Sequence, residues 1–206
     1  MGQKRHKILF LADVIDSTGL EQPKRIYGRL DASCRKLNKR FSPSIPLQRQ
    51  YGDEIAGLFE EAAPLYEIIA QLREAAYPDA KIRFVAIRGK IGAMDTDISK
   101  VGGEVFKRAS EQIESLKRKG RFGHFEIFQR DDVVLNALVQ TSNYLIESMT
   151  ERQRRVYTLL KEERTHEQIA HQFKVTRQTI SNTAKRGAAE IVLESEAAVR
   201  RLLTHS

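Results

Sequence analysis

The order of apolar patterns in the first 130 residues limits the fold more than any other feature of this sequence. Ile8–Val14 is a short apolar run typical of a buried strand. Residues 26–41 repeat apolar side chains at spacings of three and four, which predicts a helix. Residues 45–50 and 54–59 flank a Gly-Asp pair and predict a β-hairpin.

Four more elements follow at similar spacing. The patterns predict helices over 62–76 and 105–119, and strands over 82–91 and 122–128. The order is therefore βαββαβ with one added helix and strand, which predicts an α+β class with a ferredoxin-like α/β sandwich. A helix over 131–147 follows. We expect an α/β domain in residues 1–130, a connecting helix in 131–148 and an all-α domain in 149–206.

The last sixty residues contain three helical patterns separated by short turns. They cover residues 150–163, 166–173 and 177 to about 193, and a threonine at the start of each can cap it. Two helices joined by a three- or four-residue turn meet at a steep angle, and the second can enter the major groove of DNA. The pattern predicts a helix-turn-helix module that binds duplex DNA.

The outward positions of the third helix suit bases and phosphates. Asn and Gln can pair with adenine, Arg with guanine, and basic side chains with phosphate. The net charge is +8, and residues 148–206 carry 11 basic and 7 acidic side chains. The alternative is a three-helix bundle whose outward polar face is only solvated. The predicted DNA contacts are Thr176, Arg177, Gln178, Ser181, Asn182, Lys185 and Arg186.

Residues 149–189 resemble the region-four helix-turn-helix of bacterial sigma factors and response regulators. The motifs are Glu-Arg-Gln-Arg-Arg-Val, Thr-His-Glu-Gln-Ile-Ala and Val-Thr-Arg-Gln-Thr-Ile-Ser. The turn carries Lys174 where that family usually has Gly, so we expect a slightly different turn. One such module buries little surface on DNA, so we expect a homodimer. Its contact would use Ile191, Val192, Leu193, Val199, Leu202 and Leu203.

Two aspartates stand out in the first 130 residues. Asp13 ends the first strand and Asp53 lies in the hairpin turn, so neighbouring strands would bring the two carboxylates together. Paired carboxylates suit Mg²⁺, which can hold nucleotide phosphates. The alternatives are a helix cap for Asp13 and an ordinary Gly-Asp turn for Asp53.

The segments Leu11–Thr18 and Tyr51–Phe59 resemble two motifs of class III nucleotidyl cyclases, whose matching aspartates bind metal. The resemblance implies a metal role for Asp13 and Asp53. Val101–Ala109 resembles a later helix of that family. The family's Asn and Arg, which stabilise the transition state, fall on Phe106 and Ser110 here. No catalytic residue is therefore predicted.

A second resemblance, over residues 8–128, is to the SatD family of bacterial proteins. The shared motifs are Asp13 with Ser17, the run Gly-Asp-Glu at 52–54, and Phe106-Lys-Arg-Ala109. This resemblance implies a fold more than a function.

Together these patterns favour a DNA-binding transcriptional regulator whose N-terminal domain senses a nucleotide or another ligand. The alternative is a Mg²⁺-dependent nucleotide-binding or nucleotidyl-cyclase-like enzyme that uses Asp13 and Asp53. No apolar run is long enough to cross a membrane, and a cytoplasmic location is expected. The lone Cys34 is expected to be a small buried side chain.

Overall fold

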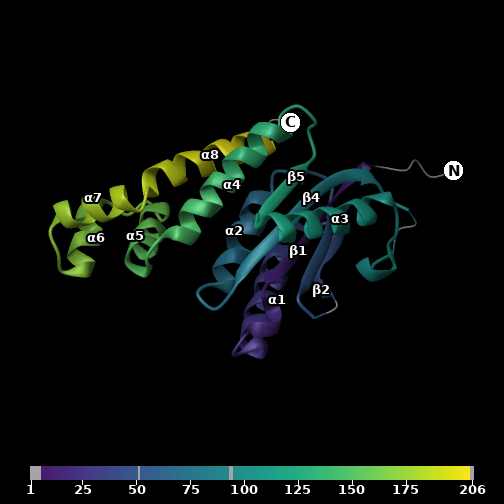
Figure 1. Cartoon of the computed structure of the whole chain (residues 1–206), viewed down its shortest axis with the longest axis horizontal. Helices are drawn as coiled ribbons and strands as arrows, with labels where there is room; N and C mark the ends of the chain where they lie inside the picture. Colours follow the sequence, from purple (N-terminus) through teal and green to yellow (C-terminus); the bar gives the residue numbers. More distant parts are fainter. Residues whose placement is uncertain (1–5, 51, 93–94, 205–206) are drawn as a thin grey trace. The chain divides into compact units, whose positions relative to one another are not determined.

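The computed structural model describes residues 6–50, 52–92 and 95–204. Tyr51 of the predicted hairpin motif lies outside these residues. Contacts divide the chain into two compact units, Met1–Asn136 with Leu203–Ser206, and Ala137–Leu202 (Figure 1). The predicted domain limits, near residues 130 and 148, stay a prediction.

The first unit is a mixed α+β structure with a five-stranded open sheet, as the order of patterns predicts. The strand order is β2-β3-β1-β4-β5, and only the β4–β5 pair is parallel. The elements of the chain are β1 (His6–Ile15), η1 (Ser17–Gly19), α1 (Pro23–Phe41), β2 (Ile45–Gln50), β3 (Glu54–Phe59), α2 (Leu65–Ala76), β4 (Lys81–Lys90), η2 (Ile98–Lys100), α3 (Glu104–Lys119), β5 (Gly123–Glu126), α4 (Asp132–Ser148), α5 (Glu151–Lys161), α6 (His166–Phe173), α7 (Arg177–Arg186) and α8 (Ala189–Thr204).

Strand β1 is buried on both faces because it lies in the middle of the sheet. Successive side chains of a strand point to opposite faces. Leu9 and Leu11 therefore belong to a core that includes Val105, Ala109 and Ile113 of α3. Helices α1 and α2 pack against each other and contact β2 and β4, whereas α3 contacts β1, β4 and β5 (Figure 1).

Three phenylalanine rings pack together on the sheet's opposite face, one pair stacked and the other edge to face. Phe84 is 1% exposed, and its ring centroid lies 6.3 Å from that of Phe10 and 5.5 Å from that of Phe125. Gly123 lies next to Phe84 in the parallel β4–β5 pair. A Cβ atom at Gly123 would lie 2.3 Å from Cζ of Phe84, so only glycine leaves room for this ring.

We therefore expect Gly123→Ala to lower the free energy of unfolding by about 1–3 kcal/mol, the usual cost of overpacking a core. Denaturant titration followed by circular dichroism measures this change. Gly28→Ala is the control, because a Cβ at Gly28 would meet no atom within 4 Å. A stability loss at Gly28 as large as that at Gly123 would contradict the steric explanation.

The second unit is all-α, and its helices begin where the threonines predict. Thr150 and Thr165 each accept a hydrogen bond from the backbone of the third helical residue, and a Gln at that position closes a capping box. The side chain of Thr176 caps α7 in the same way. Ile169, Ile180 and Val192 are fully buried in one apolar cluster of this unit.

The predicted end of the third helix is wrong. In the structure the helix breaks at residues 187 and 188, which separate α7 from α8. Ala188 has φ 52°, which a continuous helix does not allow. A Cβ at Gly187 would lie 3.0 Å from Cβ of Gln153, so the close approach of α5 favours glycine here. Val192 and Val199, predicted to form a dimer contact, are buried within the chain, whereas Ile191 is 57% exposed. The homodimer stays a prediction.

The turn after α6 has the left-handed geometry that usually calls for glycine. Lys174 has φ 53° and ψ 46°, and the Val175 N–H donates to the carbonyl oxygen of Ala170. This is a Schellman-type helix end. The lysine therefore does not change the turn, but its Cβ makes the left-handed conformation costly.

We expect Lys174→Gly to raise the free energy of unfolding of the second unit by about 0.5–1 kcal/mol, because glycine removes this cost. The measurement is thermal unfolding followed by circular dichroism. Lys185→Gly, at an exposed position in the last turn of α7 with an ordinary helical backbone, is the matched control and should instead destabilise by up to about 1 kcal/mol. Destabilisation by both variants would show that residue 174 is not strained.

Two smaller expectations concern single features. Cys34 is buried as predicted, and burial raises the pKa of its thiol to about 12. Within residues 6–50, 52–92 and 95–204, no helix is long and apolar enough to cross a membrane. The cytoplasmic location stays a prediction.

Candidate functional site

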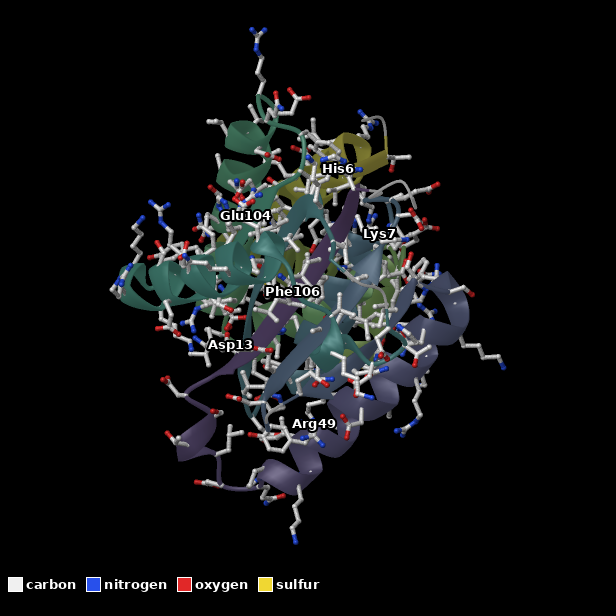
Figure 2. All side chains as sticks on the ribbon, turned by 90° about the vertical axis from the view of Figure 1, so that its right-hand side faces the viewer. His6, Lys7, Asp13, Arg49, Glu104 and Phe106 are labelled. Atoms are coloured by element: carbon white, nitrogen blue, oxygen red, sulfur yellow. The ribbon has the colours of Figure 1, made fainter. Side chains whose placement is uncertain are left out.

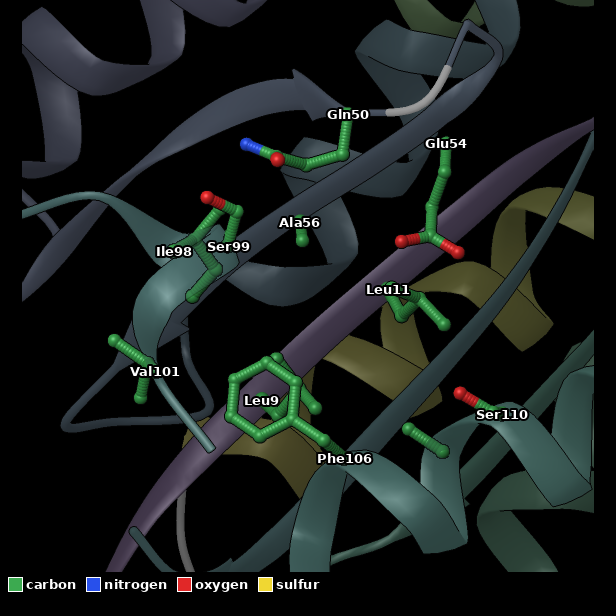
Figure 3. A pocket seen from close by; sticks show the side chains of 11 residues that line it. Leu9, Leu11, Gln50, Glu54, Ala56, Ile98, Ser99, Val101, Phe106 and Ser110 are labelled. Carbon is green, nitrogen blue, oxygen red and sulfur yellow. The ribbon is translucent and has the colours of Figure 1, made fainter. Parts of the chain in front are cut away.

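A pocket of about 190 Å³ lies between the sheet and the start of α3. Strands β1 and β3 form its floor, and η2 and α3 form its walls (Figure 3). Most of the lining is apolar, and the polar groups come from two serines, a glutamine and a glutamate. The lining residues are Leu9, Leu11, Gln50, Glu54, Ala56, Ile98, Ser99, Val101, Phe106, Ala109 and Ser110.

The pairing of β1 with β3 places a group of carboxylates beside this pocket. Leu11 lies opposite Ala56, so Asp13 and Glu54, two residues further along each strand, project from the same face. Glu54 points over the pocket floor near Leu11 (Figure 3). Asp53 comes directly before Glu54 in the hairpin. The convergence of Asp13 and Asp53 and the magnesium site both stay predictions.

Asp13 is buried, at 8% exposure, between two basic side chains. Arg83 lies directly opposite it on β4, with 3.5 Å between Arg83 Nη1 and Asp13 Oδ1. Lys117, in the last turn of α3, places its Nζ 3.3 Å from Asp13 Oδ2. Asp13 lies near the C-terminal end of β1, at the opposite end of the strand from His6 and Lys7 (Figure 2).

The pKa values of these carboxyl groups show that they affect each other. Burial raises the pKa of Asp13, while Arg83 and Lys117 partly offset that effect and the charge of Asp53 adds to it. Burial also raises the pKa of Glu54, and the charges of Asp13 and Asp53 raise it further. The three carboxyl groups therefore form one electrostatic cluster, which we call the carboxylate cluster.

The turn that carries Asp53 is held by Arg49 of β2 (Figure 2). Arg49 Nη1 donates to the carbonyl oxygen of Gly52 at 2.6 Å. Its other nitrogens donate to both carboxylate oxygens of Asp31 on α1, at 2.9 and 3.0 Å, and its guanidinium lies 4.9 Å from the ring centre of Tyr27. This arginine ties the hairpin turn to α1 and so fixes the backbone next to Asp53.

Sequence reasoning did not find Arg83, Lys117 or Arg49. The sequence does contain an indication for Arg83, which is a charged residue inside an otherwise apolar predicted strand. A buried charge needs a partner, so such a residue predicts a nearby carboxylate. Lys117 and Arg49 stand among other basic residues on exposed faces. Only the fold shows which of these basic residues reaches a carboxylate.

The carboxylate cluster fits a divalent cation on two observations. Asp13 Oδ1 is fully buried and accepts no hydrogen bond. Three carboxyl groups, Asp13, Asp53 and Glu54, face two basic side chains, so the formal charge of the ionised cluster is negative. Among the described residues no three His, Cys, Asp or Glu side chains are placed to hold a metal. Mg²⁺ commonly needs only one or two carboxylates when phosphates supply further ligands.

Phe106 and Ser110 are the positions onto which the resemblance to cyclases places that family's transition-state Asn and Arg. The half-buried Phe106 ring packs over the pocket, and the exposed Ser110 lies at its rim (Figure 3). Neither side chain carries a charge that could stabilise a transferring phosphoryl group. The expectation that no residue is catalytic stays a prediction.

The predicted DNA contacts form the outer face of α7. Ser181 is half-buried and the other six are exposed. Gln178 donates to Asn182 at 3.0 Å, and the Thr176 hydroxyl accepts from the backbone N–H of Thr179. Three of the seven residues thus use their side chains within the helix, in its cap or in a hydrogen bond along it.

The fold and the pocket thus define an α+β protein with a carboxylate cluster beside an apolar pocket. The SatD family model matches residues 7–203, and the chain belongs to the SatD family. The resemblance over residues 8–128 is therefore confirmed, and the match extends much further, through all the C-terminal helices. No curated protein sequence matches the chain.

Several solved structures are similar to part of the chain. A bacterial light-regulated adenylyl cyclase has 16% identity over 58% of this chain, with a TM-score of 0.42, and this chain covers 41% of that protein. The catalytic core of a rhodopsin-guanylyl cyclase in complex with ATPαS has 15% identity, a TM-score of 0.41, and coverage of 54% and 74%. A guanylyl cyclase has 15% identity, a TM-score of 0.38, and coverage of 55% and 71%. Similarity at this level assigns no activity.

The expectation of a DNA-binding transcriptional regulator is wrong. The SatD model matches α5, α6, α7 and α8 together with the N-terminal unit, so these helices are part of a SatD chain. Neither this match nor any other comparison indicates DNA-binding regulation or a sigma region-four module. Threonine caps and a short turn indicate only where helices begin and how they meet. Helical bundles that bind no DNA share these features, so the pattern does not identify a DNA-binding module.

Proposed function

We propose that the N-terminal unit of this SatD protein binds a nucleotide together with Mg²⁺, and that its fold is of the nucleotidyl-cyclase type. The observation that carries the proposal is that Glu54 belongs both to the pocket lining and to the carboxylate cluster. It lines the apolar pocket, and its pKa responds to Asp13 and Asp53. One continuous site therefore offers an apolar surface at one end and carboxylates at the other, which a nucleotide base and metal-bound phosphates require.

The apolar end suits a flat aromatic base. Leu9, Leu11 and Phe106 offer contact area, while Gln50 and Ser99 offer side-chain donors and acceptors at the wall. A cavity of about 190 Å³ has room for a base but not for a whole nucleoside triphosphate. The sugar and phosphates would therefore extend from the pocket toward the carboxylate cluster.

The carboxylate end repels phosphates by itself, because its net charge is negative. Asp13 and Asp53 are the residues that would hold Mg²⁺, and the bound ion would offset their charge and attract phosphate oxygens. When no ion is bound, Arg83 and Lys117 neutralise part of the negative charge of the carboxylates. With Phe106 and Ser110 in place of charged or amide groups, the proposal is binding without cyclisation of the nucleotide.

Asp53→Asn should weaken the Mg²⁺-dependent binding of ATP or GTP by at least about tenfold, equal to about 1.4 kcal/mol, because it removes one carboxylate from the cation. Isothermal titration calorimetry of the full chain with each nucleotide, in Mg²⁺ and in EDTA, measures this loss. Asp131→Asn, at an exposed position just before α4, is the matched control and should change nothing. Wild-type protein that releases no heat with millimolar nucleotide and Mg²⁺ would refute the proposal.

Ser110→Trp tests the pocket separately from the cation. Ser110 is exposed at the rim, so an indole there should cover the opening without disturbing the core. We expect affinity for nucleotide to fall about tenfold or more, about 1.4 kcal/mol, with an unchanged melting temperature. Glu111→Trp places the same ring one residue along α3, about 100° around the helix and outside the pocket lining. If both variants bind like the wild type, the base does not enter this pocket.

A further inference from the structure

We propose that Lys117 is a built-in competitor for the divalent cation at Asp13. In this proposal its ammonium neutralises the Asp13 carboxylate in the ligand-free chain, and cation binding displaces it toward Glu114. The inference rests on the proposed function, because it concerns the same carboxylate cluster. It goes further by naming the residue that sets the cation affinity of the site.

Each carboxylate oxygen of Asp13 faces one basic side chain. Arg83 Nη1 faces Oδ1 at 3.5 Å, and Lys117 Nζ faces Oδ2 at 3.3 Å. A cation that used Oδ2 would therefore have to take the position of the ammonium. Two positive charges a few ångströms apart repel each other strongly outside bulk water, so the two occupants exclude each other.

Of the two basic partners, only Lys117 can leave. The Arg83 side chain is 9% exposed, and its Nε donates to the carbonyl oxygen of Arg121 at 3.2 Å, which fixes it in the sheet. The Lys117 side chain is 44% exposed and ends a flexible four-carbon chain at the last turn of α3. Lys117 can therefore move its ammonium group into solvent, whereas the Arg83 side chain is enclosed.

Lys117 also has a second partner that would keep its charge satisfied after displacement. Glu114, one turn earlier on α3, accepts a hydrogen bond from Lys117 Nζ at 2.9 Å, which is shorter than the distance to Asp13. Glu114 is 60% exposed and contacts no other basic group among the described ion pairs. The ammonium can therefore swing away from Asp13 without losing its closest carboxylate, so displacement costs little.

Direct titration of the nucleotide-free full chain with Mn²⁺, a spectroscopic substitute for Mg²⁺, tests the inference. Electron paramagnetic resonance of the free Mn²⁺ gives the affinity and needs no enzyme activity. We expect Lys117→Met to bind Mn²⁺ on the order of tenfold more tightly, because one positive charge next to the cation is gone. Lys117→Arg keeps the charge and should bind no more tightly than the wild type.

Lys119→Met is the matched control. It removes the same charge two residues further along α3, and Lys119 forms no ion pair among the described residues. A gain as large for Lys119→Met as for Lys117→Met would overturn the inference, because it would show a general effect of net charge. Melting curves of each variant confirm that the fold is kept.

The two proposals fail in different ways. Measurable Mn²⁺ binding with equal or weaker affinity in Lys117→Met refutes the competition and leaves the proposed function intact. Absence of Mn²⁺ and of Mg²⁺–nucleotide binding in every variant refutes the proposed function. A selective gain in Lys117→Met that Asp13→Asn abolishes supports the inference.

Discussion

The pairing of β1 with β3 and β4 is the interaction on which the rest of the N-terminal unit depends. As the middle strand, β1 contributes side chains to both cores, with Phe10 in the aromatic stack and Leu9 and Leu11 under α3. Because strand side chains alternate, the same register also points Asp13 toward Arg83. A slip of one residue would exchange the two faces and remove the pocket floor and the carboxylate cluster together.

Burial of Asp13 has a cost that the chain offsets unequally. The Arg83 side chain is 9% exposed and held in the sheet, whereas the Lys117 side chain is 44% exposed. A buried carboxylate is costly unless it is paired, so both ion pairs offset the burial of Asp13. The unequal exposure of the two partners is the observation on which the proposed competition at Asp13 rests.

Most of the fold was predictable from local patterns. The hairpin strands have the predicted limits, 45–50 and 54–59, because turn residues mark both ends. The C-terminal threonines mark their helix starts because capping is a local interaction. The break after α7 was missed because the apolar pattern continues across it, although Ala188 adopts a left-handed backbone and Gln153 packs closely against Gly187. The function expected for those helices was wrong for a related reason, since a polar helix face has the same composition whether it meets DNA or water.

By itself, the sequence determined most of the elements, the α+β class and the membership in the SatD family, which the motifs around Asp13 and Asp53 suggested. These features are local, because each depends on neighbouring residues or on a short motif. The tertiary structure decided which charges meet. Arg83, Lys117 and Arg49 reach their carboxylates across 70, 104 and 18 positions of the chain. Only the register of the sheet and the packing of α3 on it bring these residues together, and no periodicity in the sequence records such distances.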